Sequence, residues 1–267
     1  MLGPPAWAAV AELARAPAQT CVLTDFDGTL APIVGDPADA NALPGALDVL
    51  HRLARRFGTV AVVSGRPAAF LVPRLALGEG RSPLRAYGSY GAERAGPDGH
   101  VTAPERAAGE AESIEAAARE LEAGLPAGVE VERKRWSVAL HWRNAPAERE
   151  RAEHLAGTAA GRHGLSPRPA RMAVELVLPA APDKGSAVAS LAAGARAACF
   201  LGDDSGDLPA FAALDELRDR TAAYTSRIAV ASDESPPDLL LAADVVLDGP
   251  ASALAFLTAI ADRSGAR

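Results

Sequence analysis

Two aspartates spaced two positions apart, Asp25 and Asp27, directly follow a short apolar, β-prone segment at residues 21–24. Gly28 and Thr29 come next, a pair typical of a loop. Two carboxylates at the end of a buried strand repel each other and lose hydration, so keeping both ionised favours the binding of a cation. With a cation bound, one carboxylate could act as a nucleophile and the other as a general acid and base. A single Asp-x-Asp pair is more often only a turn.

A second acidic cluster follows another apolar segment, residues 195–201. If both apolar segments are strands of one parallel sheet, their carboxyl ends lie at the same edge and the two clusters meet there. Magnesium takes oxygen ligands from one or two carboxylates together with substrate phosphate and water. The sequence therefore predicts a Mg²⁺ site formed by Asp25, Asp27, Asp203, Asp204 and Asp207.

Two further segments offer groups that suit a phosphate. Ser64 and Gly65 follow the apolar residues 59–63, and loop hydroxyl and N–H groups at strand-to-helix junctions commonly bind phosphate oxygens. Lys184 lies at the start of a predicted helix and supplies the positive charge that a phosphoryl group requires in an acidic site. Taken singly, these are more often an ordinary turn and a solvated lysine. The order of all four features along the chain favours a phosphate site.

The elements that must position these residues alternate between strand and helix. Apolar residues recur with helical spacing at residues 4–15 and 44–56. Continuous apolar segments indicate buried strands at residues 21–24, 59–63, 195–201 and 243–247. This alternation is typical of an α/β domain with a parallel sheet, whose chemistry is carried by loops at the carboxyl ends of the strands.

The alternation is interrupted by an insertion, which we expect at residues 96–178. Helices are predicted at residues 104–124 and 146–162, and residues 137–143 alternate between apolar and polar, which is typical of an antiparallel sheet covered on one side. Residues 1–95 and 179–267 would then form one catalytic core and the insertion a smaller α+β domain. Its polar faces would carry Glu130, Glu132, Lys134, His141, Arg143 and Glu175. Such faces are often merely solvated, but these groups also suit the hydroxyls of an anionic sugar.

Composition narrows the class of protein. The chain has 267 residues, 49% of them hydrophobic, with a net charge of −7 and a pI near 5.3. An acidic chain without an apolar stretch of membrane-spanning length argues against nucleic-acid and membrane partners. The two cysteines, Cys21 and Cys199, lie in apolar segments and indicate a reduced, cytoplasmic protein. If their strands are neighbours, the two thiols could lie on the same side of the sheet.

Four motifs, in their order along the chain, resemble those of the haloacid dehalogenase superfamily of phosphotransferases. They are Asp25-Phe26-Asp27-Gly28-Thr29-Leu30, Ser64-Gly65-Arg66, Lys184 and Gly202-Asp203-Asp204. Further motifs resemble the trehalose-6-phosphate phosphatase family within it: Gly91-Ala92-Glu93, Glu132-Arg133-Lys134, His141-Trp142-Arg143 and Glu175. The resemblance extends from about Cys21 to the last predicted strand. It implies a Rossmann-like core with helices on both faces and an inserted α+β cap domain of the C2 type.

The resemblance also implies a role for each matching residue. Asp25 would attack phosphorus and form an aspartyl-phosphate, and Asp27 would protonate the leaving sugar oxygen and then activate water. The Asp25 carboxylate, the Asp27 carbonyl and Asp203 would hold Mg²⁺, with Asp204 or Asp207 acting through water. Ser64 and Lys184 would hold the phosphoryl oxygens. Substrate-binding roles would fall to Gly28, Gly65, Arg66, Glu93, Glu132, Lys134, His141, Arg143 and Glu175.

One motif departs from the family pattern, which usually reads Gly-Asp-Asp-x-Thr-Asp-Glu. Gly206 stands in place of the threonine and Leu208 in place of the glutamate. The aspartates remain, but the groups that orient them differ. Three hypotheses therefore stay open: a trehalose-6-phosphate phosphatase, a phosphatase for another small sugar phosphate, and a weakly catalytic sugar-phosphate sensor. Nothing in the sequence favours a phosphomutase.

Overall fold

The computed structural model describes residues 2–105, 108–170 and 172–264. The chain divides into two compact units. The first comprises Met1–Ala103 and Pro182–Arg267, and the second, Pro104–Ala181, is inserted between these two parts. No helix in the described ranges is long and apolar enough to cross a membrane.

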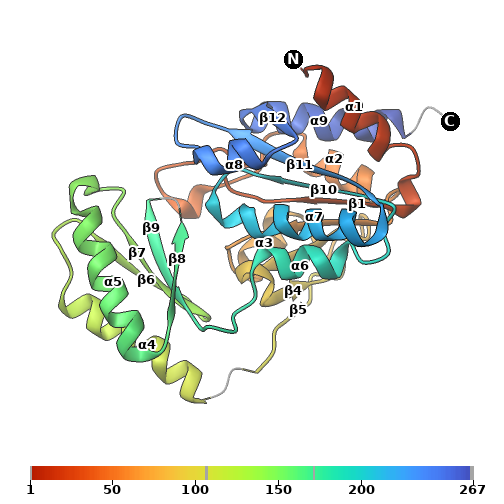
Figure 1. Cartoon of the computed structure of the whole chain (residues 1–267). Coiled ribbons are helices and arrows are strands. Elements are labelled where there is room, and N and C mark those ends of the chain that lie inside the picture. Colours follow the sequence, from red (N-terminus) through yellow and green to blue (C-terminus); the bar gives the residue numbers. More distant parts are fainter. Residues whose placement is uncertain (1, 106–107, 171, 265–267) are drawn as a thin grey trace. The chain divides into compact units, whose positions relative to one another are not determined.

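The first unit is built on an eight-stranded sheet with the order β12-β11-β10-β1-β2-β3-β4-β5 (Figure 1). Its six parallel strands are β1 (Thr20–Thr24), β2 (Thr59–Val63), β3 (Arg85–Gly88), β10 (Ala197–Gly202), β11 (Tyr224–Ala231) and β12 (Val245–Asp248). The antiparallel strands β4 (Glu93–Ala95) and β5 (Val101–Thr102) complete one edge. The predicted parallel sheet is thus confirmed, and β1, which directly precedes Asp25, lies between β2 and β10 in its centre.

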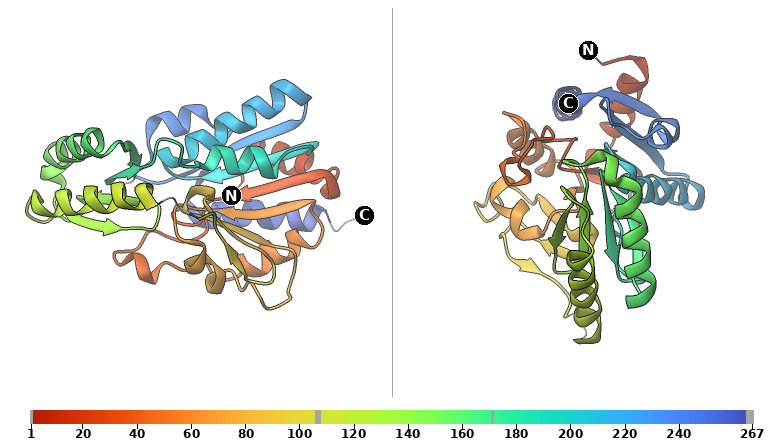
Figure 2. Two further views of the ribbon diagram at one scale, coloured as in Figure 1. Left: turned by 90° about the horizontal axis from the view of Figure 1, so that it is seen from below. Right: turned by 90° about the vertical axis from the view of Figure 1, so that its left-hand side faces the viewer.

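Helices cover both faces of this sheet (Figure 1, Figure 2). One face packs against α1 (Pro4–Leu13), α2 (Ala46–Ala54), α3 (Ala68–Arg74) and α9 (Gly249–Arg263). The other packs against α6 (Lys184–Leu191), α7 (Leu208–Thr221) and α8 (Pro237–Ala242). Burial on both faces explains why β1, β2 and β10 are continuously apolar in sequence. Short 3₁₀ turns connect these elements at Pro17–Gln19, Pro37–Asp39, Ser89–Gly91 (η3) and Ser205–Asp207 (η5).

The cysteine side chains lie on opposite faces of the sheet. β1 and β10 are neighbours, but Cys21 is in register with Ala198 and Val22 with Cys199. Because successive side chains of a strand point to opposite faces, Cys21 packs against the α6–α7 layer and Cys199 against the α1–α9 layer. The expectation that both thiols could share one side was therefore wrong. Both are free and buried.

The second unit is a four-stranded antiparallel sheet with the order β6-β7-β9-β8. Its strands are β6 (Glu130–Arg133), β7 (Ser137–His141), β8 (Ser166–Ala170) and β9 (Ala173–Val177). The helices α4 (Ala108–Ala123) and α5 (Arg149–His163), the latter preceded by a 3₁₀ turn at Pro146–Glu148, pack with the sheet around an apolar core that includes Val138, Leu140 and Trp142. Val138, Leu140 and Trp142 share this core as the alternation predicted, but Ser137 and Ala139 on the other face of β7 are buried as well, so the expectation that this strand is covered on one side only was wrong.

The insertion begins later than the sequence indicated. We expected it to begin at residue 96, but residues 96–100 form a turn and β5 then pairs with β4 in the sheet of the first unit. The turn cluster at residues 95–99, which suggested a domain boundary, is therefore the connection of a β-hairpin. At the other end, the second unit extends to Ala181 rather than to residue 178.

Candidate active site

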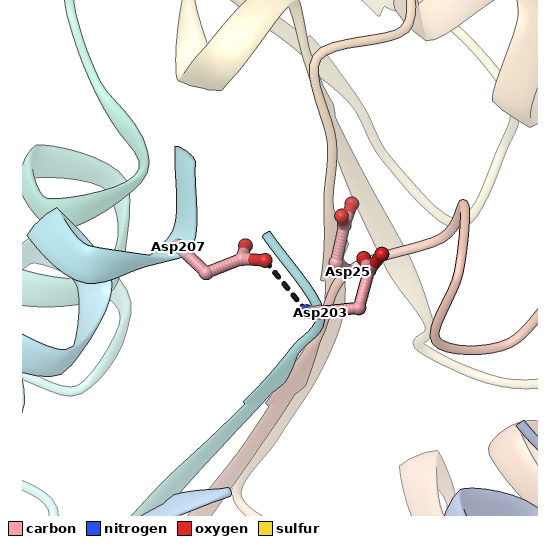
Figure 3. A group of neighbouring side chains, drawn as sticks. All are labelled: Asp25, Asp203 and Asp207. Carbon is pink, nitrogen blue, oxygen red and sulfur yellow. Dashed lines mark hydrogen bonds between the residues drawn. The ribbon is translucent and has the colours of Figure 1, made fainter. Parts of the chain in front are cut away.

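Three loops that carry candidate catalytic or metal-binding residues start at the carboxyl ends of three adjacent strands. Asp25 follows β1, Ser64 follows β2 and Asp203 follows β10, and these strands are paired in parallel. Parallel pairing brings the three loops to one edge of the sheet. Figure 3 shows the carboxylates of Asp25, Asp203 and Asp207 gathered there. One oxygen from each carboxylate lies within 4.8 Å of those chosen from the other two, and all three residues are buried.

Asp25 is held in place by its backbone. Its N–H donates to the carbonyl of Leu201 on β10 at 2.8 Å, and its Oδ1 accepts from the N–H of Phe26 at 2.6 Å. Its other oxygen, Oδ2, lies 2.9 Å from Lys184 Nζ. Burial raises the pKa of Asp25 to about 8, even though the Lys184 ammonium opposes the shift. A pKa this high means that the Asp25 carboxylate readily takes up a proton. Keeping it ionised therefore requires more positive charge than one lysine supplies.

Lys184 is the first residue of α6 and lies between two carboxylates. The helix begins with a capping box in which Asp183 Oδ1 accepts from the N–H of Ser186 at 2.8 Å. The lysine Nζ is 2.9 Å from Asp25 Oδ2 and 2.6 Å from Asp207 Oδ1. Burial alone would lower the pKa of Lys184, but the surrounding carboxylates outweigh burial and raise it well above its ordinary value. Lys184 is therefore a permanent cation in the acidic cluster.

Asp203 occupies space that the absence of a side chain at Gly28 provides. A Cβ added to Gly28 would lie 2.0 Å from Asp203 Oδ2, and Gly28 has a φ of +72°, which favours glycine. The hydroxyl of Thr29 donates to Asp203 Oδ1 at 3.4 Å. The Gly28–Thr29 pair thus makes room for the Asp203 carboxylate and orients it toward Asp25.

Asp207 acts mainly on its neighbours in the protein. One of its oxygens, Oδ2, accepts from the N–H groups of Asp203 at 2.8 Å and of Asp204 at 3.1 Å (Figure 3 shows the first). The other oxygen bonds to Lys184. Burial raises the pKa of Asp207. Asp204 is less buried, and its Oδ1 accepts from the N–H of Gly206 at 2.8 Å, which caps η5. Asp207 thereby fixes both the Asp203 loop and the lysine.

The donor set fits a hard divalent cation. Carboxylate oxygens are the ligands that Mg²⁺ prefers, and three buried carboxylates here outnumber the single Lys184 ammonium. Asp207 bonds to Lys184 through one oxygen and to two backbone N–H groups through the other, whereas Asp25 Oδ1 accepts from a single backbone N–H and Asp203 lies beside Asp25. The geometry therefore favours Asp25 and Asp203 as the side-chain ligands.

Asp27 and Arg66 form a bidentate ion pair. Arg66 Nε lies 2.8 Å from Asp27 Oδ2 and Nη2 lies 2.9 Å from Oδ1, with both side chains about a quarter exposed. The guanidinium also lies over the ring of Phe70, 4.5 Å from its centre. Ser64 is buried and its hydroxyl accepts from the N–H of Arg66 at 3.2 Å. Arg66, which we expected on the substrate, thus also orients the residue expected to serve as acid and base.

Glu93 helps to fix the loop at residues 64–66 through a contact with the helix that follows it. It is buried on β4, and its Oε2 accepts from the N–H of Ala68 at the start of α3 at 2.7 Å. A carboxylate is favourable at this end of a helix because it satisfies a free N–H and interacts well with the helix dipole. This contact fixes the start of α3 close behind residues 64–66, so Glu93 has a structural role whatever its role toward substrate.

In the second unit, four of the predicted substrate residues form one network. Lys134 Nζ lies 3.4 Å from Glu132 and 3.2 Å from the buried Glu175, and His141 Nε2 lies 2.9 Å from Glu132. Burial would raise the pKa of Glu132, but hydrogen bonds from His141 and Lys134 outweigh burial and lower it to about 2. Glu132, Ala139 and Glu175 are aligned across three strands. Arg143 lies beyond the end of β7 and is exposed.

Sequence reasoning missed Arg168. It lies on β8, in register with Glu175, and so places a positive charge beside Glu175 at the end of the row formed by Glu132, Ala139 and Glu175. Prolines lie on both sides of it, Pro167 and Pro169; they would be unfavourable in a central strand, but β8 is an edge strand, where proline is tolerated. The alternation of Arg168 with two prolines was the one sequence feature that could have indicated an edge strand here.

Comparisons with known proteins agree with this geometry. The family described as Trehalose-phosphatase matches residues 23–238. A trehalose-phosphate phosphatase of Mycobacterium avium (strain 104) is 36% identical over 252 residues, which cover 91% of this chain and 62% of that protein. The chain thus spans about three-fifths of the length of this curated relative.

Two solved structures share the fold. The C-terminal domain of the C. albicans trehalose-6-phosphate phosphatase aligns with a TM-score of 0.76 at 20% identity, covering 95% of this chain and 96% of that one. A haloacid dehalogenase-like hydrolase from Bacteroides thetaiotaomicron aligns with a TM-score of 0.59 at 12% identity, covering 90% and 98%. At these identities the likeness shows the fold, and it confirms the predicted core of the haloacid dehalogenase type.

Proposed function

The chain belongs to the trehalose-phosphatase family, and on this premise we propose that it hydrolyses trehalose 6-phosphate to trehalose and orthophosphate. The observation that carries the proposal is the position of Asp25: a buried carboxylate at the centre of the sheet edge, with Lys184 2.9 Å away and Asp203 beside it. Such a residue can be held as a nucleophile only if positive charge collects around it, and a phosphorylated substrate with a divalent cation supplies the partners that this charge pattern lacks.

In the proposed mechanism, an oxygen of Asp25 attacks phosphorus and the bond from phosphorus to the sugar oxygen breaks. Asp27 gives its proton to the leaving oxygen, and an aspartyl-phosphate remains on Asp25. Asp27 then takes a proton from a water molecule, which attacks phosphorus and breaks the bond to Asp25, releasing orthophosphate. Lys184 and Ser64 hold the phosphoryl oxygens throughout. Arg66 holds Asp27 through two hydrogen bonds, and one of these must open before that oxygen can carry a proton and give it to the leaving group.

We further propose that the Asp25 and Asp203 carboxylates and the Asp27 carbonyl hold Mg²⁺, with Asp204 acting through water. When bound, Mg²⁺ supplies positive charge that offsets the charge of the phosphoryl oxygens and of the nucleophile. Asp207, which we first expected among the ligands, would instead position Lys184 and the Asp203 loop, since its oxygens bond to both.

The second unit is proposed to be the cap domain that recognises the sugar. Its network of Glu132, Lys134, His141 and Glu175 combines donors and acceptors held in fixed positions by one another, as recognition of sugar hydroxyls requires. Arg143 and Arg168 add positive charge to the same unit. The free, buried cysteines support a reducing, cytoplasmic location.

The test is phosphate release from trehalose 6-phosphate, measured beside a panel of other sugar monophosphates such as glucose 6-phosphate. We expect the highest kcat/KM for trehalose 6-phosphate, complete loss on addition of EDTA and recovery with excess Mg²⁺. Asp25→Asn should abolish turnover and retain binding. Activity that survives chelation would contradict the proposed metal, and a higher kcat/KM for another sugar phosphate would contradict the substrate. Wild-type protein that binds sugar phosphate without turnover would instead favour the sensor hypothesis.

A further inference from the structure

Tyr90 lies in the turn η3 in an unusual backbone conformation. It has a φ of +58°, and Ser89 before it has a φ of +49°. Two consecutive non-glycine residues in the left-handed region cost free energy and persist only where the surroundings fix them. Here the N–H of Ser89 donates to the carbonyl of Arg66 at 2.7 Å, and the N–H of Tyr90 donates to the carbonyl of Ser64 at 2.9 Å. The strained turn thus clamps the loop at residues 64–66.

The Tyr90 ring fills the space beside two glycines of the candidate active site. A Cβ added to Gly65 would lie 2.9 Å from Tyr90 Cζ, 3.0 Å from Oη and 3.3 Å from Cε1, so its three nearest neighbours all belong to this side chain. A Cβ added to Gly206 would lie 3.7 Å from the same Cε1 atom. One edge of the ring therefore lies between the loop after β2 and the acidic loop after β10.

Neither glycine is required by its backbone. Gly65 and Gly206 both lack the positive φ that favours glycine, although ten other glycines of the described chain have it. Gly65 requires the absence of a side chain, because the Tyr90 side chain occupies that volume. At Gly206 a Cβ would be in ordinary contact with the ring, 3.7 Å from Cε1, but the γ atoms of a threonine would extend about 1.5 Å further, toward the ring or toward Asp204 Oδ1, which lies 3.0 Å from the Cβ position.

The same turn also contacts the helix that carries the lysine. A Cβ added to Gly91, the last residue of η3, would lie 3.0 Å from the Cβ of Ala187 on α6. The turn at Ser89–Gly91 therefore touches the three segments that carry Ser64, Lys184 and Asp203–Asp207. A shift of the ring would change the spacing between groups proposed to bind one phosphate.

From these contacts we propose that Tyr90 is a positioning residue of the phosphate site, whose ring sets the separation between the Ser64–Gly65 loop and the Asp204–Gly206 loop. The inference rests on the proposed function only in taking these loops to bind phosphate. It predicts that Tyr90 and Gly65 are energetically coupled, because the Tyr90 side chain occupies the space that a side chain at position 65 would need.

A double-mutant cycle on binding of orthophosphate in the presence of Mg²⁺ tests the coupling. Gly65→Ala should weaken binding by about tenfold by pushing the ring, and Tyr90→Ala by about tenfold by leaving the loops unsupported. The double variant should be no more than about tenfold weaker than the wild type, because its added methyl group occupies volume vacated by the ring. Losses that multiply to about a hundredfold would show independent residues and overturn the proposal.

Further variants separate positioning from general stability and from the hydroxyl. Tyr90→Phe keeps the ring and should rescue most of the affinity lost in Tyr90→Ala; if it loses as much, the hydroxyl and not the ring is responsible, and the proposal fails. Gly206→Thr should weaken binding in the wild-type background and less so beside Tyr90→Ala. Gly35→Ala, where a Cβ would meet no atom within 4 Å, is the matched control. Equal melting temperatures ensure that affinity is compared between folded proteins.

The double-mutant cycle on orthophosphate binding does not depend on which sugar phosphate the protein hydrolyses. If the wild type binds orthophosphate with Mg²⁺ but releases none from trehalose 6-phosphate, the proposed function fails, while the coupling between Tyr90 and Gly65 can still be measured. If turnover is confirmed, the same cycle measured on kcat/KM should show the same non-additivity.

Discussion

Lys184 Nζ lies 2.6 Å from Asp207 Oδ1, and both side chains are buried. Asp207 in turn accepts hydrogen bonds from the backbone of Asp203 and Asp204. The pair therefore links the one buried cation of the cluster to the loop proposed to bind the metal. Removing either partner affects charge balance and loop geometry together.

The first prediction concerns the charge at Lys184. Lys184→Met leaves the Asp25 and Asp207 carboxylates buried without their cation, so the free energy of unfolding measured by denaturant in EDTA should fall by about 3–5 kcal/mol. Excess Mg²⁺ should recover part of this loss, since it offsets the same charge. Arg220→Met removes a surface pair with Glu216 and should change stability by less than about 1 kcal/mol. A loss for Lys184→Met as small as that of the control would contradict the electrostatic argument.

The second prediction uses two glycines with the same backbone conformation. Gly28 has a φ of +72° and Gly45 a φ of +86°, but a Cβ on Gly28 would meet the Asp203 carboxylate, whereas one on Gly45 would meet no atom within 4 Å. Both alanine variants should lose about 1 kcal/mol of stability from backbone strain. Only Gly28→Ala should also weaken Mg²⁺ binding, by about tenfold or more, in a calorimetric titration. Equal Mg²⁺ affinities for the two variants would exclude the steric role of Gly28.

The motifs predicted the sheet edge well because strand order follows from simple rules. Acidic residues after two apolar segments were enough to place Asp25 and Asp203 together, since parallel strands end at the same edge. One signal was overlooked: Lys134 and Lys184 are the only two lysines among 27 basic residues. In a chain that otherwise uses arginine, a lysine indicates a position that needs a compact point charge.

Other features depended on contacts that the sequence does not express. The pairing of Arg66 with Asp27 joins loops that are 39 positions apart, and its geometry follows from how β1 and β2 are placed in the sheet. The faces of Cys21 and Cys199 depended on a register offset of one residue, which sends each thiol to the opposite layer. Tyr90 resembled an ordinary residue of a glycine-rich turn, because a positive φ at tyrosine leaves no mark in sequence.

The third prediction tests the role proposed for the second unit. Glu132→Gln removes the charge that His141 and Lys134 hold in place, so kcat/KM for trehalose 6-phosphate should fall by about tenfold, the value of one charged hydrogen bond. The fall should be smaller for p-nitrophenyl phosphate, which has no sugar. Glu153→Gln, a surface carboxylate of α5 in the same unit, is the matched control and should change neither value. An equal fall for both substrates with Glu132→Gln would place its effect in the chemistry or the fold and not in sugar recognition.

The last prediction concerns pH and a buried histidine away from the candidate active site. His51 Nε2 lies 3.0 Å from the carbonyl of Leu75, which can only accept, so this nitrogen carries the proton and Nδ1 accepts from the Ser82 hydroxyl at 2.7 Å. Burial lowers the pKa of His51, and the nearby guanidinium groups of Arg81 and Arg55 lower it further. The unfolded chain therefore binds a proton at His51 more readily than the folded one, so stability is full above the ordinary pKa of about 6.5 and is lost as pH falls below it. The stability difference between wild type and His51→Gln, measured by chemical denaturation, should be larger at pH 8 than at pH 5. A stability difference for His51→Gln that does not change with pH would refute the assignment.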